Sequence, residues 1–174
     1  MSKKVLIVIL LTATVLATGI VADTAYSGSI PINFRVSGTF IYVHFPTVDR
    51  VGILIDIVAK GAPGNAVAKV VGIPGAILLP PNPYCGEGIT AQEYDFDDMV
   101  ITFKDQSMLF ATLDYGYVCF GPPPAVFVMD ITGGTGKYKN VTGGSLTGTF
   151  DAQPVGNSGI LYAETGTIVG EILR

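Results

Sequence analysis

Residues 125–150 read AVFVMDITGGTGKYKNVTGGSLTGTF, which is a glycine turn between two β-rich stretches. The second stretch, Ser145–Phe150, sets Leu146, Gly148 and Phe150 against hydroxyl side chains at alternate positions, the pattern of a half-buried strand. The 22 glycines and 11 prolines of the 174 residues interrupt the rest of the chain in a similar way. No window after residue 22 keeps a 3.6-residue apolar period, so the sequence predicts strands and no helix there.

Strand signals recur along the chain at nearly regular spacing. We expect strands at Phe34–Phe45, Val51–Val58, Val67–Val71, Ile89–Phe96, Met99–Phe103, Met108–Val118, Ala125–Ile131, Ser145–Phe150 and Ile160–Leu173. A proline-rich loop, Pro74–Pro83, interrupts the strands. At Asp97-Asp98 the alternation of apolar and polar positions shifts by one residue, and this shift separates two of the segments. Eight or nine short strands so spaced are typical of an antiparallel sandwich or barrel, and the sequence predicts an all-β domain.

The first 22 residues have the layout of a secretory signal peptide, with two lysines, an apolar run and then small residues. We expect a signal helix over residues 1–22 and cleavage after Ala22, with Gly19 and Ala25 as alternative cleavage positions. One domain over residues 23–174 should follow, secreted or periplasmic. An uncleaved membrane anchor is the alternative, because the apolar run from Val5 to Ala22 is 18 residues, just long enough to span a bilayer.

Composition limits the classes of function. Removing residues 1–22 leaves eight basic against 14 acidic residues, a net charge of −6 in place of −4 for the whole chain. This charge argues against a nucleic-acid partner, because neutralising phosphates needs a basic surface. The apolar content of 49% excludes intrinsic disorder. After cleavage of the signal we expect no membrane contact.

The glycine turn raises the question of phosphate binding, because it contains Gly136-Lys137. The spacing does not fit a phosphate loop: Ile131 stands where the first glycine belongs, and Tyr138 follows the lysine in place of Ser or Thr. We therefore interpret the turn as structural, with glycines that supply positive φ angles and a bulge and with Tyr138 and Val141 tucked under the end of the sheet. The turn glycines are Gly133, Gly134, Gly136 and Gly143.

The stretch Ile131–Gly143 and the Ser/Leu/Thr/Gly strand after it resemble the TGGTGxFxxAxG motif of allene-oxide-cyclase-like and dirigent-like β-barrels. Phe34–Phe40, the prolines before Cys85, and Met108–Leu113 leading to Cys119 resemble small secreted bacterial proteins, many of them cyanobacterial. The resemblance implies a closed antiparallel barrel of eight strands. It assigns no catalytic residue, since the functional residues of the two enzyme-like families have no matching positions here.

Cys85 and Cys119 are the two cysteines of the chain. In an exported protein a single pair predicts a disulfide, which would join the proline-rich loop to the end of the Met108–Val118 strand. The alternatives are two free thiols or a metal site, for which the one histidine, His44, is remote in sequence.

Glu93, Asp95 and Asp97 form an acidic run on one face of a predicted strand, about 6–7 Å apart in steps of two. Carboxylates so arranged could hold Ca²⁺, but no Asp-x-Asp-x-Asp-Gly loop accompanies them. A charge run usually solvates a strand, and this is the interpretation we favour. We expect neither a metal nor a cofactor.

Four polar residues are candidates for the lumen of the barrel or for ligand contact: His44, Arg35, Tyr115 and Tyr117. The histidine could act as an acid or base near neutral pH, the arginine could meet an anionic ligand, and the tyrosine hydroxyls could line a pocket. The ordinary alternatives are a structural histidine, an arginine facing solvent and tyrosines packed across strands.

The catalytic residues are unassigned, because the sequence shows no recognisable nucleophile motif, set of metal ligands or cofactor-binding loop. Our first hypothesis is a secreted, non-catalytic barrel that binds a small apolar ligand or a surface partner, or serves structurally. The second is a cyclase or dirigent-type guide protein that holds a small apolar substrate in the lumen. A packed lumen would favour the first, and a large cavity with converging polar groups the second. The sequence specifies no oligomeric state.

Overall fold

The computed structural model describes residues 28–46, 49–121 and 125–174, apart from the side chains of Phe45, Phe96 and Asp97. The predicted signal helix lies outside these residues. Eight strands and one short 3₁₀ helix follow one another along the chain: β1 (Ser29–Phe45), β2 (Arg50–Ala62), β3 (Ala66–Leu78), β4 (Ala91–Phe103), β5 (Met108–Cys119), β6 (Ala125–Gly134), η1 (Gly136–Tyr138), β7 (Gly143–Pro154) and β8 (Leu161–Leu173).

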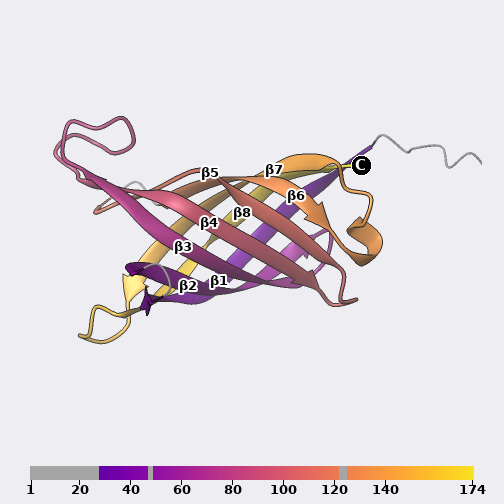
Figure 1. The fold of residues 1–174 in the computed structure, drawn as a ribbon, viewed down its shortest axis with the longest axis horizontal. Helices are drawn as coiled ribbons and strands as arrows, with labels where there is room; N and C mark the ends of the chain where they lie inside the picture. The colour runs from indigo at the N-terminus through magenta and orange to yellow at the C-terminus, as the bar shows by residue number, and fades with distance from the viewer. Residues whose placement is uncertain (1–27, 47–48, 122–124) are drawn as a thin grey trace, which may run out of the picture.

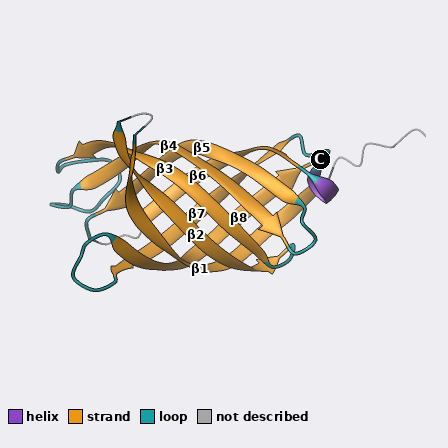
Figure 2. Ribbon diagram, turned by 60° about the horizontal axis from the view of Figure 1, so that its bottom comes forward, coloured by secondary structure: helices purple, strands orange, loops and turns teal. Residues whose placement is uncertain are grey.

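The strands form a closed antiparallel barrel in which each pairs with its neighbours in sequence, as Figures 1 and 2 show. The first strand closes the barrel. It pairs with β2 from Asn33 to Phe45 and with β8 from Ser29 to Ile41. The predicted all-β barrel is confirmed, and closure leaves no sheet edge along most of its length.

The predicted segments Ile89–Phe96 and Met99–Phe103 belong to a single strand, β4, so the strand count is eight. The inward-facing side chains do change phase along this strand, between Tyr94 and Met99, both of which are buried. Bulges between β3 and β4 accompany the change, next to Pro74. Because β3 continues to Leu78, the proline-rich loop begins later than the sequence suggested.

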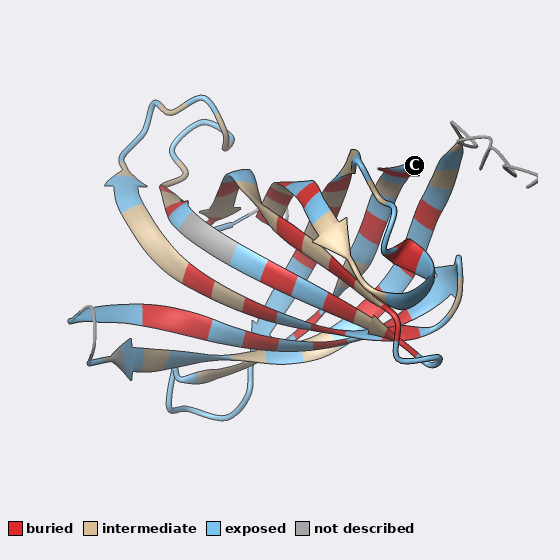
Figure 3. Ribbon diagram, turned by 45° about the vertical axis from the view of Figure 1, so that its right-hand side comes forward, coloured by how far each residue is buried: buried red, intermediate tan, exposed pale blue. Residues whose placement is uncertain are grey.

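Buried and exposed residues alternate along the strands, so every strand turns one row of side chains into the barrel (Figure 3). β2 shows the pattern clearly, with Ile53, Ile55, Ile57 and Ala59 buried between exposed residues. Inward-facing side chains from all eight strands form one hydrophobic core. The interior is therefore mostly filled with side chains.

The glycine turn lies at the end of the barrel where β6 and β7 are connected. Gly136 (φ 58°) and Gly143 (φ 156°) take positive φ angles, and a bulge lies between the pairs Phe110–Gly133 and Ala111–Ile131. η1 directs Tyr138 inward, where the residue is 1% exposed and its ring centroid lies 4.7 Å from that of Phe103. Tyr138 therefore plugs this end, and we call it the closed end.

Several glycines allow neighbouring strands to approach closely. A methyl group on Gly38 would collide with the carbonyl oxygen of Asp56 on β2, and one on Gly166 would collide with that of Thr149 on β7. Such glycines mark places where a barrel strand bends sharply.

We predict that Gly166→Ala lowers the free energy of unfolding by about 2 kcal/mol, because backbone atoms must move to admit the methyl group. Gly133→Ala is the matched control, since the atom nearest to its added methyl is 4.0 Å away, in the Phe110 ring. Its effect should stay within about 0.5 kcal/mol. Urea denaturation of both variants tests this, and equal losses would contradict the close-approach argument.

Candidate ligand-binding site

The end of the barrel opposite the closed end holds a cavity of about 490 Å³, which we call the mouth cavity. Its lining residues come from the ends of β5 and β7, the starts of β6 and β8, and the part of β1 where its pairing with β8 ends. Its wall combines aromatic, small and polar residues. Among them are Phe40, Tyr42, Phe120, Phe150, Gln153 and Tyr162.

Three aromatic rings from β1 and β8 form a shelf in this cavity. Phe40 and Tyr162 are register partners, and their rings stack in parallel with centroids 4.6 Å apart. Tyr42 stands edge-on to both rings, at 5.9 and 6.0 Å. Burial, with a smaller contribution from Tyr162, raises the pKa of the Tyr42 hydroxyl, which is therefore neutral at physiological pH. The shelf offers a flat apolar face with hydroxyl groups.

Phe150 separates the mouth cavity from the interior below it. Its ring folds back over Gly148 on the same strand, where a Cβ would collide with it. It also contacts Phe127, with centroids 6.0 Å apart, and Phe127 in turn contacts Tyr94 at 5.2 Å. Phe150 forms the floor of the mouth cavity, and its contact with Phe127, which contacts Tyr94 in turn, supports its ring.

Glu164 lies in the interior on β8 and is 5% exposed. It lines a small inner cavity of about 20 Å³ whose other walls are apolar and include Phe150. No hydrogen-bond partner for its Oε1 atom is found within the described structure. Burial raises the pKa of the carboxyl to about 7, because the charged form loses its hydration without gaining a partner.

Sequence reasoning missed Glu164, although a signal was present. Counting back in steps of two from the buried Ile172 and Ile168 along β8 leads to Gly166 and then to Glu164. The period-two rule therefore places the carboxyl inside.

Arg35 and His44, two of the candidates for the lumen, lie outside it. Arg35 is exposed between the buried Phe34 and Val36, so alternation turns it outward. His44 lies at the exposed end of β1, and its Nε2 atom is 3.2 Å from Oδ1 of Asp49. Neither residue lines the mouth cavity.

Tyr115 and Tyr117 also lie on the outer surface, because Gly116 between them faces inward beneath the Phe127 ring. Tyr115 is 47% exposed. Tyr117 stacks on Tyr84 with centroids 4.5 Å apart, so its aromatic partner lies in the loop between β3 and β4 and not on a neighbouring strand.

The acidic run does not form a metal centre among the described residues. Glu93 is half-buried and Asp95 is exposed, with Oδ2 of Asp95 4.0 Å from Nη1 of Arg50, while the Asp97 side chain is outside the description. In the part of the chain that the structure describes, no three His, Cys, Asp or Glu side chains gather as metal ligands would.

A second, shallower cleft of about 530 Å³ adjoins the mouth cavity and shares Tyr42 with it. This cleft forms because the pairing of β2 with β3 ends at Ile53 and Gly72. Beyond that pair, the β1–β2 hairpin and the β3–β4 hairpin separate. Exposed residues such as Val51 and Ile77 line it. Buried residues such as Phe150 line the mouth cavity, which is therefore the better enclosed of the two.

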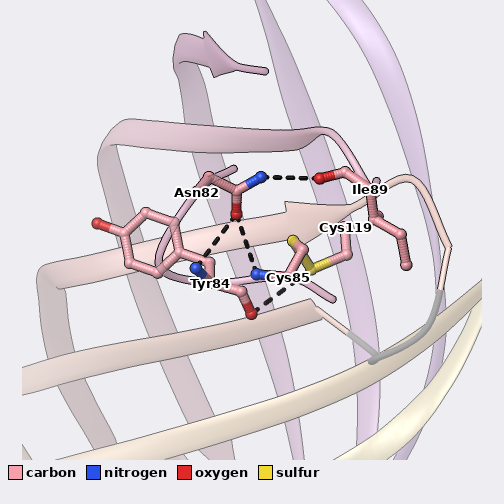
Figure 4. Close-up of a disulfide and its surroundings, with 5 residues drawn as sticks. All are labelled: Asn82, Tyr84, Cys85, Ile89 and Cys119. Carbon is pink, nitrogen blue, oxygen red and sulfur yellow. Dashed lines mark hydrogen bonds between the residues drawn. A yellow bond between two sulfur atoms is a disulfide. The ribbon is translucent and has the colours of Figure 1, made fainter. Parts of the chain in front are cut away.

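The predicted disulfide between Cys85 and Cys119 is present, with Cα atoms 5.8 Å apart (Figure 4). Asn82 orders the loop around it. Its Oδ1 accepts hydrogen bonds from the backbone N–H groups of Tyr84 and Cys85, and its Nδ2 donates to the carbonyl of Ile89. Because Cys119 and the two residues after it line the mouth cavity, the disulfide fixes part of its rim.

The fold and the site define a closed up-and-down antiparallel β-barrel with an aromatic cavity at one end. The chain matches no protein-family model and no curated protein. The disulfide is consistent with folding in an oxidising compartment. Within the described residues, no helix has the length and hydropathy to cross a membrane.

We predict that Cys85→Ala/Cys119→Ala lowers the free energy of unfolding by about 3–4 kcal/mol, because opening the covalent loop frees the unfolded chain. Urea denaturation of the oxidised wild type and the double variant measures the difference. Thiol titration of the denatured, unreduced wild type is the control and should detect no reactive thiol; two thiols would contradict the disulfide.

We also predict that Glu164 makes stability fall as pH rises. The folded state holds the carboxyl proton up to a pKa of about 7 and the unfolded state loses it near 4.5. The contribution of Glu164 to the free energy of unfolding is therefore complete below pH 4.5, and about 3 kcal/mol of it is lost as the pH rises through 7. Glu164→Gln should lack this decline. Denaturation of both proteins between pH 4.5 and 8.5 tests it, and parallel pH profiles would refute it.

Proposed function

We propose that this barrel binds a small, largely apolar molecule in its mouth cavity and that binding, not catalysis, is its role. The observation that carries the proposal is the shelf of Phe40, Tyr42 and Tyr162 in a cavity of about 490 Å³. Cavities that bind small molecules have about this volume and combine aromatic walls with a few polar groups. Flat rings of a ligand can stack on such a shelf.

The packing below the floor supports binding over catalysis. Under Phe150 the interior contains an inner cavity of only about 20 Å³, so a substrate has little room beside Glu164. The interior of a small barrel can be filled by side chains, and the mouths of β-barrels are a common place for ligand pockets. The polar residues at the rim, such as Gln153, would orient the molecule there.

The proposal includes export of the mature protein from the cytoplasm. The signal-peptide layout of residues 1–22 and the Cys85–Cys119 disulfide support a mature protein that begins after Ala22 and works in the periplasm or outside the cell. The resemblance to small secreted bacterial barrels of the allene-oxide-cyclase-like and dirigent-like kind supports it as well.

A second candidate is a cyclase or dirigent-type guide protein, and Glu164 favours it. A carboxyl group with a pKa of about 7 in an apolar interior can exchange a proton with a bound molecule near neutral pH. This candidate requires the substrate to pass Phe150, whereas the binding role does not.

The test of the proposal uses n-butylbenzene as the probe and NMR titration of the mature protein as the measurement. We predict that Tyr162→Ala weakens binding about fivefold, because a stacking partner worth about 1 kcal/mol is lost. Tyr115→Ala is the matched control and should bind as the wild type does, since its ring lies on the outer surface. Equal affinities of the two variants would reject the mouth cavity.

Mass spectrometry of small molecules that co-purify with the mature protein then separates the two candidates. Recovery of the molecule unchanged after incubation with fresh protein supports binding. Conversion that stops in Glu164→Gln supports the guide protein.

A further inference from the structure

We propose that Glu164 is the polar anchor of a deeper subsite, where its carboxyl donates a hydrogen bond to one carbonyl oxygen at the end of an otherwise apolar ligand. The body of that ligand would occupy the mouth cavity, so the inference rests on the proposed function. The ligand class is then a neutral, ring-containing ketone or aldehyde, not a hydrocarbon and not an amine.

The size of the inner cavity sets the size of the group that Glu164 receives. About 20 Å³ admits one group as large as a water molecule. Water itself is poorly suited, because an ordered buried water needs two to four polar partners. The inner cavity is lined by apolar residues and a single carboxyl. One oxygen atom on an apolar skeleton fits both its volume and its polarity.

The charge of the surroundings selects a neutral ligand. The side chains packed around Glu164 are aliphatic or thioether groups on β2, β3, β4 and β6, and phenyl rings on β6 and β7. On β1 its register partner is Gly38. The described core contains two further titratable groups, Tyr94 on β4, whose ring contacts Phe127, and Tyr138 at the closed end.

In such surroundings the carboxyl stays protonated to about pH 7. A protonated carboxyl donates one hydrogen bond through its O–H group. The group that satisfies it best is therefore an acceptor, and a carbonyl oxygen is an acceptor only. The Oε1 atom, which has no partner in the free protein, marks where the polar end of the ligand would lie.

Phe150 is the barrier between the two cavities, because it lines both of them. A ligand that reaches Glu164 has to displace this ring from its place over Gly148. Phe150→Ala should therefore join the cavities and speed the entry of such a ligand. A molecule that rests on the aromatic shelf alone needs no such movement.

Three probes with one skeleton test the subsite in the mature protein: 4-phenyl-2-butanone, n-butylbenzene and 4-phenylbutylamine. Their affinities are measured by NMR titration at pH 5.5 and pH 8.5 for the wild type, Glu164→Gln and Glu164→Leu. The ketone should bind the wild type at least tenfold more tightly at pH 5.5, since the protonated fraction falls about thirtyfold between the two pH values. Binding of n-butylbenzene should not depend on pH.

The two variants give the matched controls. Glu164→Gln should bind the ketone equally at both pH values, because its amide N–H donates in either case. Glu164→Leu should bind the ketone no better than n-butylbenzene. Circular dichroism and the binding of n-butylbenzene show that each variant is folded.

Ketone binding that changes neither with pH nor in the two variants, while n-butylbenzene still binds, would overturn the subsite and leave the proposed function intact. Tighter binding of the amine at pH 8.5 that disappears in Glu164→Gln would show a cation site and also overturn it. Failure of all three probes to bind the wild type at millimolar concentration would contradict the subsite and the mouth-cavity proposal together.

Discussion

The pairing of β1 with β8 is the constraint on which the rest of the structure depends. Once that ladder forms, every strand has two neighbours and the sheet has an inside and an outside. A shift of one residue in β8 would turn Ile168 and Ile172 to solvent, so its register is strongly specified. The same register carries Glu164 inward, opposite Gly38 on one side and Ala152 on the other. The buried carboxyl is thus held in place by the hydrophobic residues that follow it.

The two ends of the barrel differ in structure, since one is closed by a side chain and the other holds the mouth cavity. At one end η1 inserts Tyr138 against Phe103, with Nζ of Lys137 4.6 Å from the centroid of the Phe103 ring. At the other end the disulfide and the aromatic shelf lie at the mouth cavity. Between them lie the packed core and the small inner cavity. Phe150 lines both the mouth cavity and the inner cavity and so separates the two.

Much of the fold could be predicted from the sequence, because period-two alternation and glycine or proline breaks act over a few residues. The cysteine pair could be predicted as well, since the chain offers one pairing. The mouth cavity could not, because Phe40 and Tyr162 are brought together only by closure of the barrel. For Arg35 both a lumenal and a solvent-facing position were open on chemical grounds, and the apolar Phe34 and Val36 beside it already indicate the outward direction. Glu164 was missed for the converse reason, since a carboxylate is normally expected in solvent.

The described chain begins and ends at the closed end of the barrel (Figure 1). The backbone N–H of Arg174 donates to the carbonyl of Gly28 over 3.3 Å, so the two ends of the described chain are held side by side. A protein or a solid support joined at the C-terminus would therefore stand behind the barrel and leave the mouth unobstructed. Molecules attached to a surface in this way would all turn the aromatic shelf away from that surface and toward the solution.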